Sequence, residues 1–128
     1  MCSVENCNLE YLSPDYFGLL SNRNVAHVFN AWTRMPPLDE QARLNDAYTA
    51  DFTEVRALLR RGLAYEQAVE AFEPYRLIQE PNEGAREGMR RVAERSRKKR
   101  IPAFLFVNNR LEGNAPSTIE AVVQGLVT

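Results

Sequence analysis

The sequence contains few of the residues from which metal sites and nucleophilic sites are built. It has two cysteines, Cys2 and Cys7, and one histidine, His27, among 128 residues. The cysteines do not form a Cys-x-x-Cys pair, and a zinc site needs three or four close ligands. We therefore expect no Cys/His metal site. The thiols are expected to be reduced and near a chain end, where one of them could be buried.

Long apolar runs and an excess of one charge are also missing. No segment approaches the roughly 18 apolar residues that span a bilayer, and the start of the chain lacks the basic and apolar regions of a secretory signal. The formal net charge is −1 and the isoelectric point is about 5.9, so no overall positive field attracts nucleic acid or anionic lipid. These features predict a cytoplasmic protein without a membrane partner.

What the sequence does contain is an alternation of strand and helix patterns. Strands are predicted at residues 2–6, 25–30, 52–57 and 103–108, with clear apolar runs at 25–30 and 103–108 and an ambiguous pattern at 52–57. Helices are predicted at residues 13–21, 38–46, 65–72, 83–100 and from Ser117 onward. This alternation predicts one α/β domain, residues 1–128, with parallel strands joined by helical crossovers.

The two ends of the helical series carry the clearest local signals. Ser13 is a good N-cap before Pro14, which suits the first helical position. Ser117 and Glu120 have the spacing of a capping box for the last helix. The apolar residues of that helix fall on one face, at Ile119, Val122, Val123 and Leu126.

Four segments carry a resemblance to a known family. They are residues 10–20, 25–41, 56–72 and 104–122, and the paired amides Asn108-Asn109 before Gly113 are their most specific part. In order and spacing they are similar to the C-terminal half of the YecE-like family, known as domain of unknown function 72. The resemblance implies a fragment of a TIM-type (β/α) barrel, comprising about four parallel βα units of a barrel roughly twice this length. The family has no established activity.

The chain also departs from the family pattern. Glu5 and Asn8 match a strand ending in Glu-x-Arg-Asn, but Cys7 stands where the arginine is expected. Only Arg56 matches an Arg-x-His-Gly sequence on the next-to-last strand. Half a barrel leaves two free sheet edges and an uncovered inner face. The resemblance therefore implies a homo-oligomer, a complex with a separate first half, or a truncated relic that folds poorly.

Ligands of such barrels bind at the carboxyl ends of the strands. The candidate ligand-binding residues there are Glu5, Asn30, Trp32, Arg34, Arg56, Asn108 and Asn109, with Arg60 as a further possibility. Carboxylate, guanidinium and amide groups suit a small polar or partly anionic ligand, such as a sugar or a phosphate ester. The alternative to ligand binding is a purely structural role for these residues: a Glu5–Arg56 ion pair, loop contacts of the two amides, and a core position for Trp32.

The reaction and any cofactor stay open. A hydrolase or isomerase would rest on analogy with other barrels alone. His27 lies inside a predicted strand, where a structural role is favoured, so a general base would have to be Glu5 or an acid elsewhere. Residues 86–100 carry eight Lys or Arg and two acids. They could bind phosphate or nucleic acid, but no aromatic residues interleave with the charges, which favours a solvated helix face.

Overall fold

The centre of the molecule is a parallel sheet of four strands in the order β1–β2–β3–β4. The computed structural model describes residues 1–32, 34–59 and 64–126. The strands are β1 (Cys2–Glu5), β2 (Val25–Ala31), β3 (Thr53–Ala57) and β4 (Ala103–Val107). Each predicted strand is confirmed to within a residue or so at either end. Every strand pairs with the next one along the chain, which leaves β1 and β4 as the two edges of this sheet.

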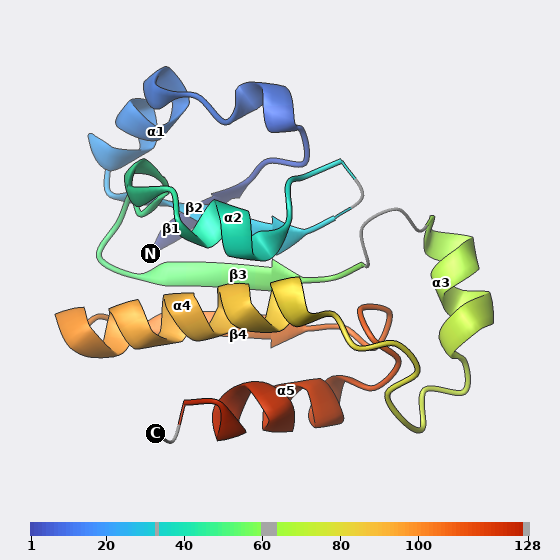
Figure 1. Cartoon of the computed structure of the whole chain (residues 1–128). Coiled ribbons are helices and arrows are strands. Elements are labelled where there is room, and N and C mark those ends of the chain that lie inside the picture. Colours follow the sequence, from blue (N-terminus) through green and yellow to red (C-terminus); the bar gives the residue numbers. More distant parts are fainter. Residues whose placement is uncertain (33, 60–63, 127–128) are drawn as a thin grey trace.

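Helices connect the strands and cover one side of the sheet. They are α1 (Pro14–Ser21), α2 (Leu38–Ala42), α3 (Tyr65–Phe72), α4 (Glu83–Lys99) and α5 (Ala115–Gln124). Helices α2 and α4 lie across the sheet, α1 and α5 flank them, and α3 stands beyond the carboxyl ends of the strands (Figure 1). The helix predicted at 38–46 is shorter than expected, because the chain leaves α2 after Ala42 and forms a separate 3-10 turn at Asn45–Ala47.

The strand register decides which side chains share a face of the sheet. Phe29 pairs with Val55, and Val55 pairs with Leu105, so these side chains lie on the same side. They belong to the main core, which packs them against residues of the helices, including Phe17, Leu38, Met89, Val92 and Val122. The helices therefore bury one face of the sheet.

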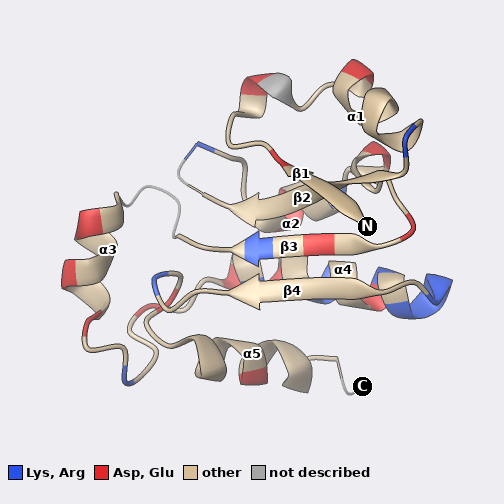
Figure 2. Cartoon of the chain, turned by 180° about the vertical axis from the view of Figure 1, so that it is seen from behind, with Lys and Arg blue, Asp and Glu red and all other residues tan. Residues whose placement is uncertain are grey.

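The opposite face, which we call the open face, has no helix over it within the described residues (Figure 2). The same register gives its members as Ser3, Glu5, Ala26, Val28, Asn30, Glu54, Arg56, Phe104 and Phe106. The central Val28 is 1% exposed, whereas Phe104 and Phe106 on the edge strand β4 are 39% and 54% exposed. An α/β sheet ordinarily has both faces covered. This face is therefore bare along β4 for a parallel sheet, although Ala26, Val28 and Asn30 in β2 are buried.

Helix α5 begins earlier than the predicted capping box. The side-chain oxygen of Asn114 accepts a hydrogen bond from the Ser117 backbone N–H, so Asn114 is the N-cap and the helix starts at Ala115. The prediction of Ser117 as the cap was wrong because Pro116 already fits the first turn. Val122 is buried, but Ile119 and Val123 are 46% and 52% exposed, since the apolar stripe is wider than the contact of α5 with α4 and β4.

A glycine allows α4 to lie close to α2. A Cβ atom on Gly88 would come within 2.7 Å of the Leu38 carbonyl carbon and 2.8 Å of its oxygen. A glycine inside a helix costs roughly 1 kcal/mol relative to alanine. The close packing of α4 against α2 explains why position 88 holds a glycine despite this cost.

Candidate functional site

Three of the predicted site residues converge on the open face at the carboxyl ends of the strands. Glu5 ends β1, and Asn30 of β2 pairs in register with Arg56 of β3. Arg56 Nη1 donates to Glu5 Oε1 at 2.5 Å, and Asn30 Nδ2 donates to Glu5 Oε2 at 3.3 Å. We call Glu5, Asn30 and Arg56 the polar cluster. The side chains of Arg56 and Glu5 are 41% and 22% exposed, so water reaches the charges of the pair.

Asn30 is the buried member of the polar cluster. Its Nδ2 also donates to the Asn6 carbonyl oxygen at 3.2 Å, while Gln41 of α2 donates to its backbone oxygen at 2.8 Å. The Oδ1 atom of Asn30 is buried and has no hydrogen-bond partner among the described residues. A buried acceptor without a donor costs about 1–3 kcal/mol. The polar cluster therefore holds two charged groups and one unused acceptor.

Cys7 lies next to this cluster, and its thiol is not activated. Both cysteines are exposed, so the possibility of a buried thiol is wrong. Desolvation raises the pKa of Cys7, the nearby Glu5 carboxylate raises it further, and Arg56 and Asn30 lower it only in part. Because the thiolate is the reactive form, Cys7 is a poor nucleophile at neutral pH.

Trp32 and Arg34 do not join the polar cluster. Trp32 packs against a small second core formed by Leu59, Ala68 and Phe72. It also lines a cavity of about 330 Å³ together with residues that include Pro36, Pro37 and Asn82. Arg34 is exposed, and within the described part of the chain it has no ion pair. Arg60, the further candidate, lies outside the described residues.

Asn108 and Asn109 shape their own loop. Asn108 Oδ1 accepts from the Arg110 N–H at 2.9 Å, and Asn109 Oδ1 accepts from the Ala115 N–H at 2.7 Å. The described residues show no hydrogen bond from either amide to the polar cluster. Gly113 closes the loop at a φ of 122°, where a side chain would collide with the Leu77 carbonyl oxygen. The two amides thus have the loop contacts that were the structural alternative to ligand binding.

The same loop contains a buried carboxylate that the sequence analysis missed. Glu112 is fully buried and accepts hydrogen bonds from Arg86 Nε at 2.8 Å and Nη2 at 3.0 Å. The Asn82 N–H donates at 2.6 Å and the Thr118 hydroxyl at 2.5 Å. Burial alone would raise the pKa of Glu112, but these hydrogen bonds and the charge of Arg86 bring it below its ordinary value. The network ties the loop after β4 to the starts of α4 and α5.

No sequence signal distinguished Glu112 from a solvated loop residue. It stands between Leu111 and Gly113 in a polar loop, which is where an exposed glutamate is most often found. Its partner Arg86 lies 26 residues earlier, on helix α4. Only the fold brings the two charges together.

Comparisons with protein-family models, with curated proteins and with solved structures gave no match. Within residues 1–32, 34–59 and 64–126, no helix is long and apolar enough to cross a membrane. The same ranges contain no group of three or more His, Cys, Asp or Glu that could hold a metal ion. The chain is an α/β protein built on a parallel sheet, and its similarity to the YecE-like family stays a prediction.

Proposed function

We propose that this chain is half of a YecE-like (β/α) barrel and that a second copy of the chain supplies the other half. The observation that carries the proposal is the open face, which leaves Phe104 and Phe106 in contact with water. A (β/α) barrel has eight parallel strands with helices only on the outside. This chain has four parallel strands in sequence order and its helices on one side, so two copies have the strand number of a barrel.

The sheet edges favour a second copy as the partner. A twofold rotation about an axis parallel to the strands would place β4 of each copy beside β1 of the other and keep every strand parallel. The backbone groups left unpaired at both edges would then find partners, which removes the exposed edges that promote aggregation. The two exposed phenylalanines would turn into the barrel interior. One interface would thus satisfy the edges and the open face together.

In such a barrel the polar cluster would lie at the mouth formed by the carboxyl ends of the strands. The planar guanidinium of Arg56 would donate hydrogen bonds to a phosphate or carboxylate, and the Glu5 carboxylate would accept hydrogen bonds from hydroxyl groups of the ligand. Asn30 Oδ1 offers an acceptor that nothing in the described chain uses. We therefore propose a small, polar, partly anionic ligand of the sugar phosphate type. The proposal extends to binding and names no reaction.

The assembly is tested by measuring molar mass with light scattering on a sizing column. We expect twice the chain mass of 14.6 kDa. Phe106→Glu places a charge on the open face and should abolish the dimer. Val123→Glu is the matched control, because Val123 is exposed to a similar extent, 52% against 54%, but lies on α5. A folded wild-type monomer would refute the proposal, and a dimer that only Val123→Glu dissociates would place the interface on α5.

The ligand site is tested on the wild-type chain by calorimetric titration with glucose 6-phosphate. We expect binding that Arg56→Gln weakens at least tenfold, the loss typical of one charged hydrogen-bonding partner. Arg110→Gln should leave the affinity unchanged, because Arg110 lies over the Tyr65 ring and the described residues show no hydrogen bond or ion pair between it and the polar cluster. Equal weakening by both substitutions would contradict a site at the polar cluster.

A further inference from the structure

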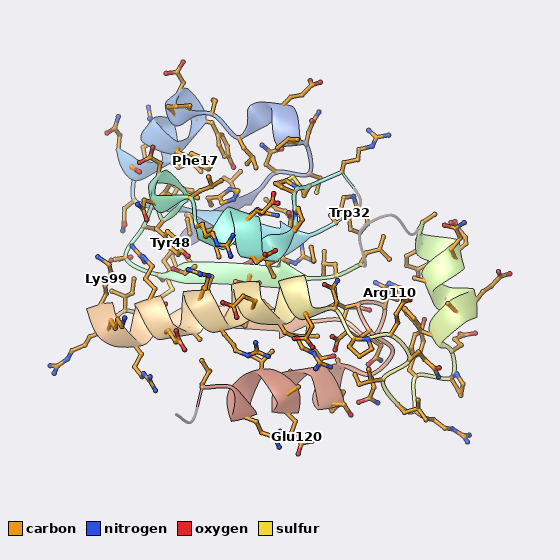
Figure 3. All side chains as sticks on the ribbon, viewed as in Figure 1. Phe17, Trp32, Tyr48, Lys99, Arg110 and Glu120 are labelled. Carbon is orange, nitrogen blue, oxygen red and sulfur yellow. The ribbon has the colours of Figure 1, made fainter. Side chains whose placement is uncertain are left out.

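A second charged feature lies at the other end of the sheet. It is a hollow of about 370 Å³ between the segment around Tyr48 and the C-terminal half of α4. Its charged lining consists of five cationic residues and one acid: Arg43, Arg91, Arg95, Lys98, Lys99 and Glu94. We call it the cationic hollow. Tyr48 and Lys99 are at the opposite end of the molecule from Trp32 and Arg110, so this hollow is separate from the polar cluster (Figure 3).

Four of the five positive charges of the cationic hollow have no ion pair within the described chain. Arg91 forms an ion pair with Glu87 at 3.3 Å. The described residues provide no ion pair for the remaining four cations, Arg43, Arg95, Lys98 and Lys99. On a solvated helix face, charges of both signs usually alternate and pair along the helix. The surplus of one sign around a hollow is therefore a local positive field, although the whole chain carries a net charge of −1.

The position of Arg95 is fixed by contacts that leave part of its guanidinium unused. Its Cζ atom lies 3.8 Å from the centre of the Tyr48 ring, and the Tyr48 hydroxyl donates to the Ala42 oxygen at 2.7 Å. The Nη1 atom of Arg95 is buried and has no hydrogen-bond partner among the described residues. Arginine remains charged in proteins, so a desolvated donor of this kind is costly without an acceptor. Arg95 also lines the hollow and is only partly buried, so the rest of its guanidinium can donate to an anionic oxygen there.

The helix dipole accounts for only part of this charge. Cations near a helix C-terminus are favoured by the negative end of the dipole, which explains Lys98 and Lys99 in the last turn of α4. Arg95 lies before that turn, and Arg43 comes from the end of α2. These two arginines are placed together by the packing of α2 against α4. The dipole gives no reason for them to gather around one hollow.

We propose that the cationic hollow binds a small, multiply charged phosphate compound. Its volume falls within the range of small-molecule sites, and arginine and lysine side chains are the usual partners of phosphate oxygens. A single nucleic-acid strand needs free aromatic faces on which bases can stack. Here Arg95 already covers one face of the Tyr48 ring, the aromatic residue lining the hollow. The geometry therefore favours a compact phosphate ligand over a strand.

The proposal is tested by calorimetric titration of the full chain with inorganic pyrophosphate at 50 and 150 mM salt. We expect binding that weakens at the higher salt and that Arg95→Gln reduces at least tenfold. Lys99→Gln, at an exposed position, should also weaken binding. It serves as a second test if circular dichroism shows that Arg95→Gln does not fold. Arg110→Gln is the matched control, because Arg110 makes the same kind of contact with a tyrosine ring elsewhere, at 4.5 Å.

Other outcomes would overturn the proposal. Absence of pyrophosphate binding at 50 mM salt would refute the proposal. Binding that both Arg95→Gln and Lys99→Gln leave unchanged would also refute it. Tighter binding of a single-stranded oligonucleotide than of pyrophosphate would assign the hollow to nucleic acid instead. Arg56→Gln should not affect pyrophosphate binding at the hollow. This keeps the result independent of the proposed site at the polar cluster.

Discussion

Replacing Glu112 by glutamine should lower the free energy of unfolding by about 3–5 kcal/mol, the usual cost of removing one partner from a buried ion pair. The substitution keeps the shape of the side chain but removes the buried anion of the Arg86 guanidinium, which is only 14% exposed and keeps only the largely exposed Glu83 carboxylate, at 3.5 Å. The Thr118 hydroxyl and the Asn82 N–H would each lose a charged acceptor. A domain of this size is stable by only about 5–15 kcal/mol in total. The expected loss is therefore a large part of the stability.

Urea unfolding of the wild type and the variant measures this loss. Glu120→Gln is the control, because Glu120 is an exposed residue of α5 whose side chain accepts only a weak bond from Gln124 at 3.4 Å. It should change stability by less than about 0.5 kcal/mol. Adding Arg86→Met to Glu112→Gln should restore part of the stability, since no unpaired charge then remains. A loss below about 1 kcal/mol for Glu112→Gln would show that the network contributes little.

The direction of the Glu112 pKa also predicts its response to acid. The carboxylate binds its proton less readily in the folded chain than in the unfolded chain, where its pKa is about 4.5. The stability contributed by its charge is therefore present above that value and is lost as the pH falls through the lower pKa of the folded state. Acid unfolding below about pH 4.5 should accordingly be less steep in Glu112→Gln.

The second large effect is a loss of stability between pH 6.5 and about 4 that depends on His27. The imidazole is 2% exposed and meets the rings of Phe17 and Phe29 edge-on, with centroids 5.3 and 5.1 Å away. Its Nδ1 atom lies 3.4 Å from the Tyr16 hydroxyl. Desolvation in these aromatic surroundings lowers the pKa of His27 from 6.5 to about 4. A charge on the ring would thus stand in an apolar core.

The sign of the effect follows from which state binds the proton. Between pH 6.5 and about 4 the unfolded chain is protonated at His27 and the folded chain is not. Lower pH therefore favours the unfolded state, and the stability is complete only above pH 6.5. One pKa unit corresponds to about 1.4 kcal/mol, so the full difference is of the order of 3 kcal/mol. Most of this loss should have occurred by pH 5.

Urea unfolding at pH 7.5, 6 and 5 tests this prediction. His27 is the only histidine, so no other imidazole contributes to the slope. His27→Phe replaces the imidazole by another ring in the aromatic cluster and should make stability nearly constant over this range. A wild-type midpoint that does not move between pH 7.5 and 5 would show that the ring accepts its proton inside the fold. The same slope in wild type and His27→Phe would assign the titration to other groups.

Local sequence patterns determined the secondary structure well. The apolar runs at residues 25–30 and 103–108 form strands, because β-branched and aromatic residues fit a pleated surface covered by neighbours. Ser13 caps α1 as predicted, with its hydroxyl accepting from the Tyr16 N–H at 3.3 Å. Such signals act within a few residues of the chain and can be recognised without the fold. The wrong prediction of Ser117 as N-cap is also a local error of three residues, because Asn114 is an equally good cap three residues earlier.

Contacts between distant segments were decided only by the tertiary structure. The sequence named Glu5, Asn30 and Arg56 as candidates through the ends of predicted strands, and the parallel register brought them together. Trp32, Asn108 and Asn109 lie on loops after the strands and contact local partners there, whereas Arg34 is exposed. Where a loop goes depends on the packing of the whole chain.

The charged residues show most clearly which features the local sequence determined and which the tertiary structure decided. The sequence determined that residues 86–99 lie in a basic helix, since composition and periodicity are properties of one segment. It did not reveal that Arg86 points to a buried glutamate while Arg95 joins Arg43 around a hollow. Those outcomes depend on which helix packs against which, and helix packing is set by apolar contacts over the whole core. The local sequence therefore determined the elements, and the tertiary structure decided which charges are buried, paired or left free to bind.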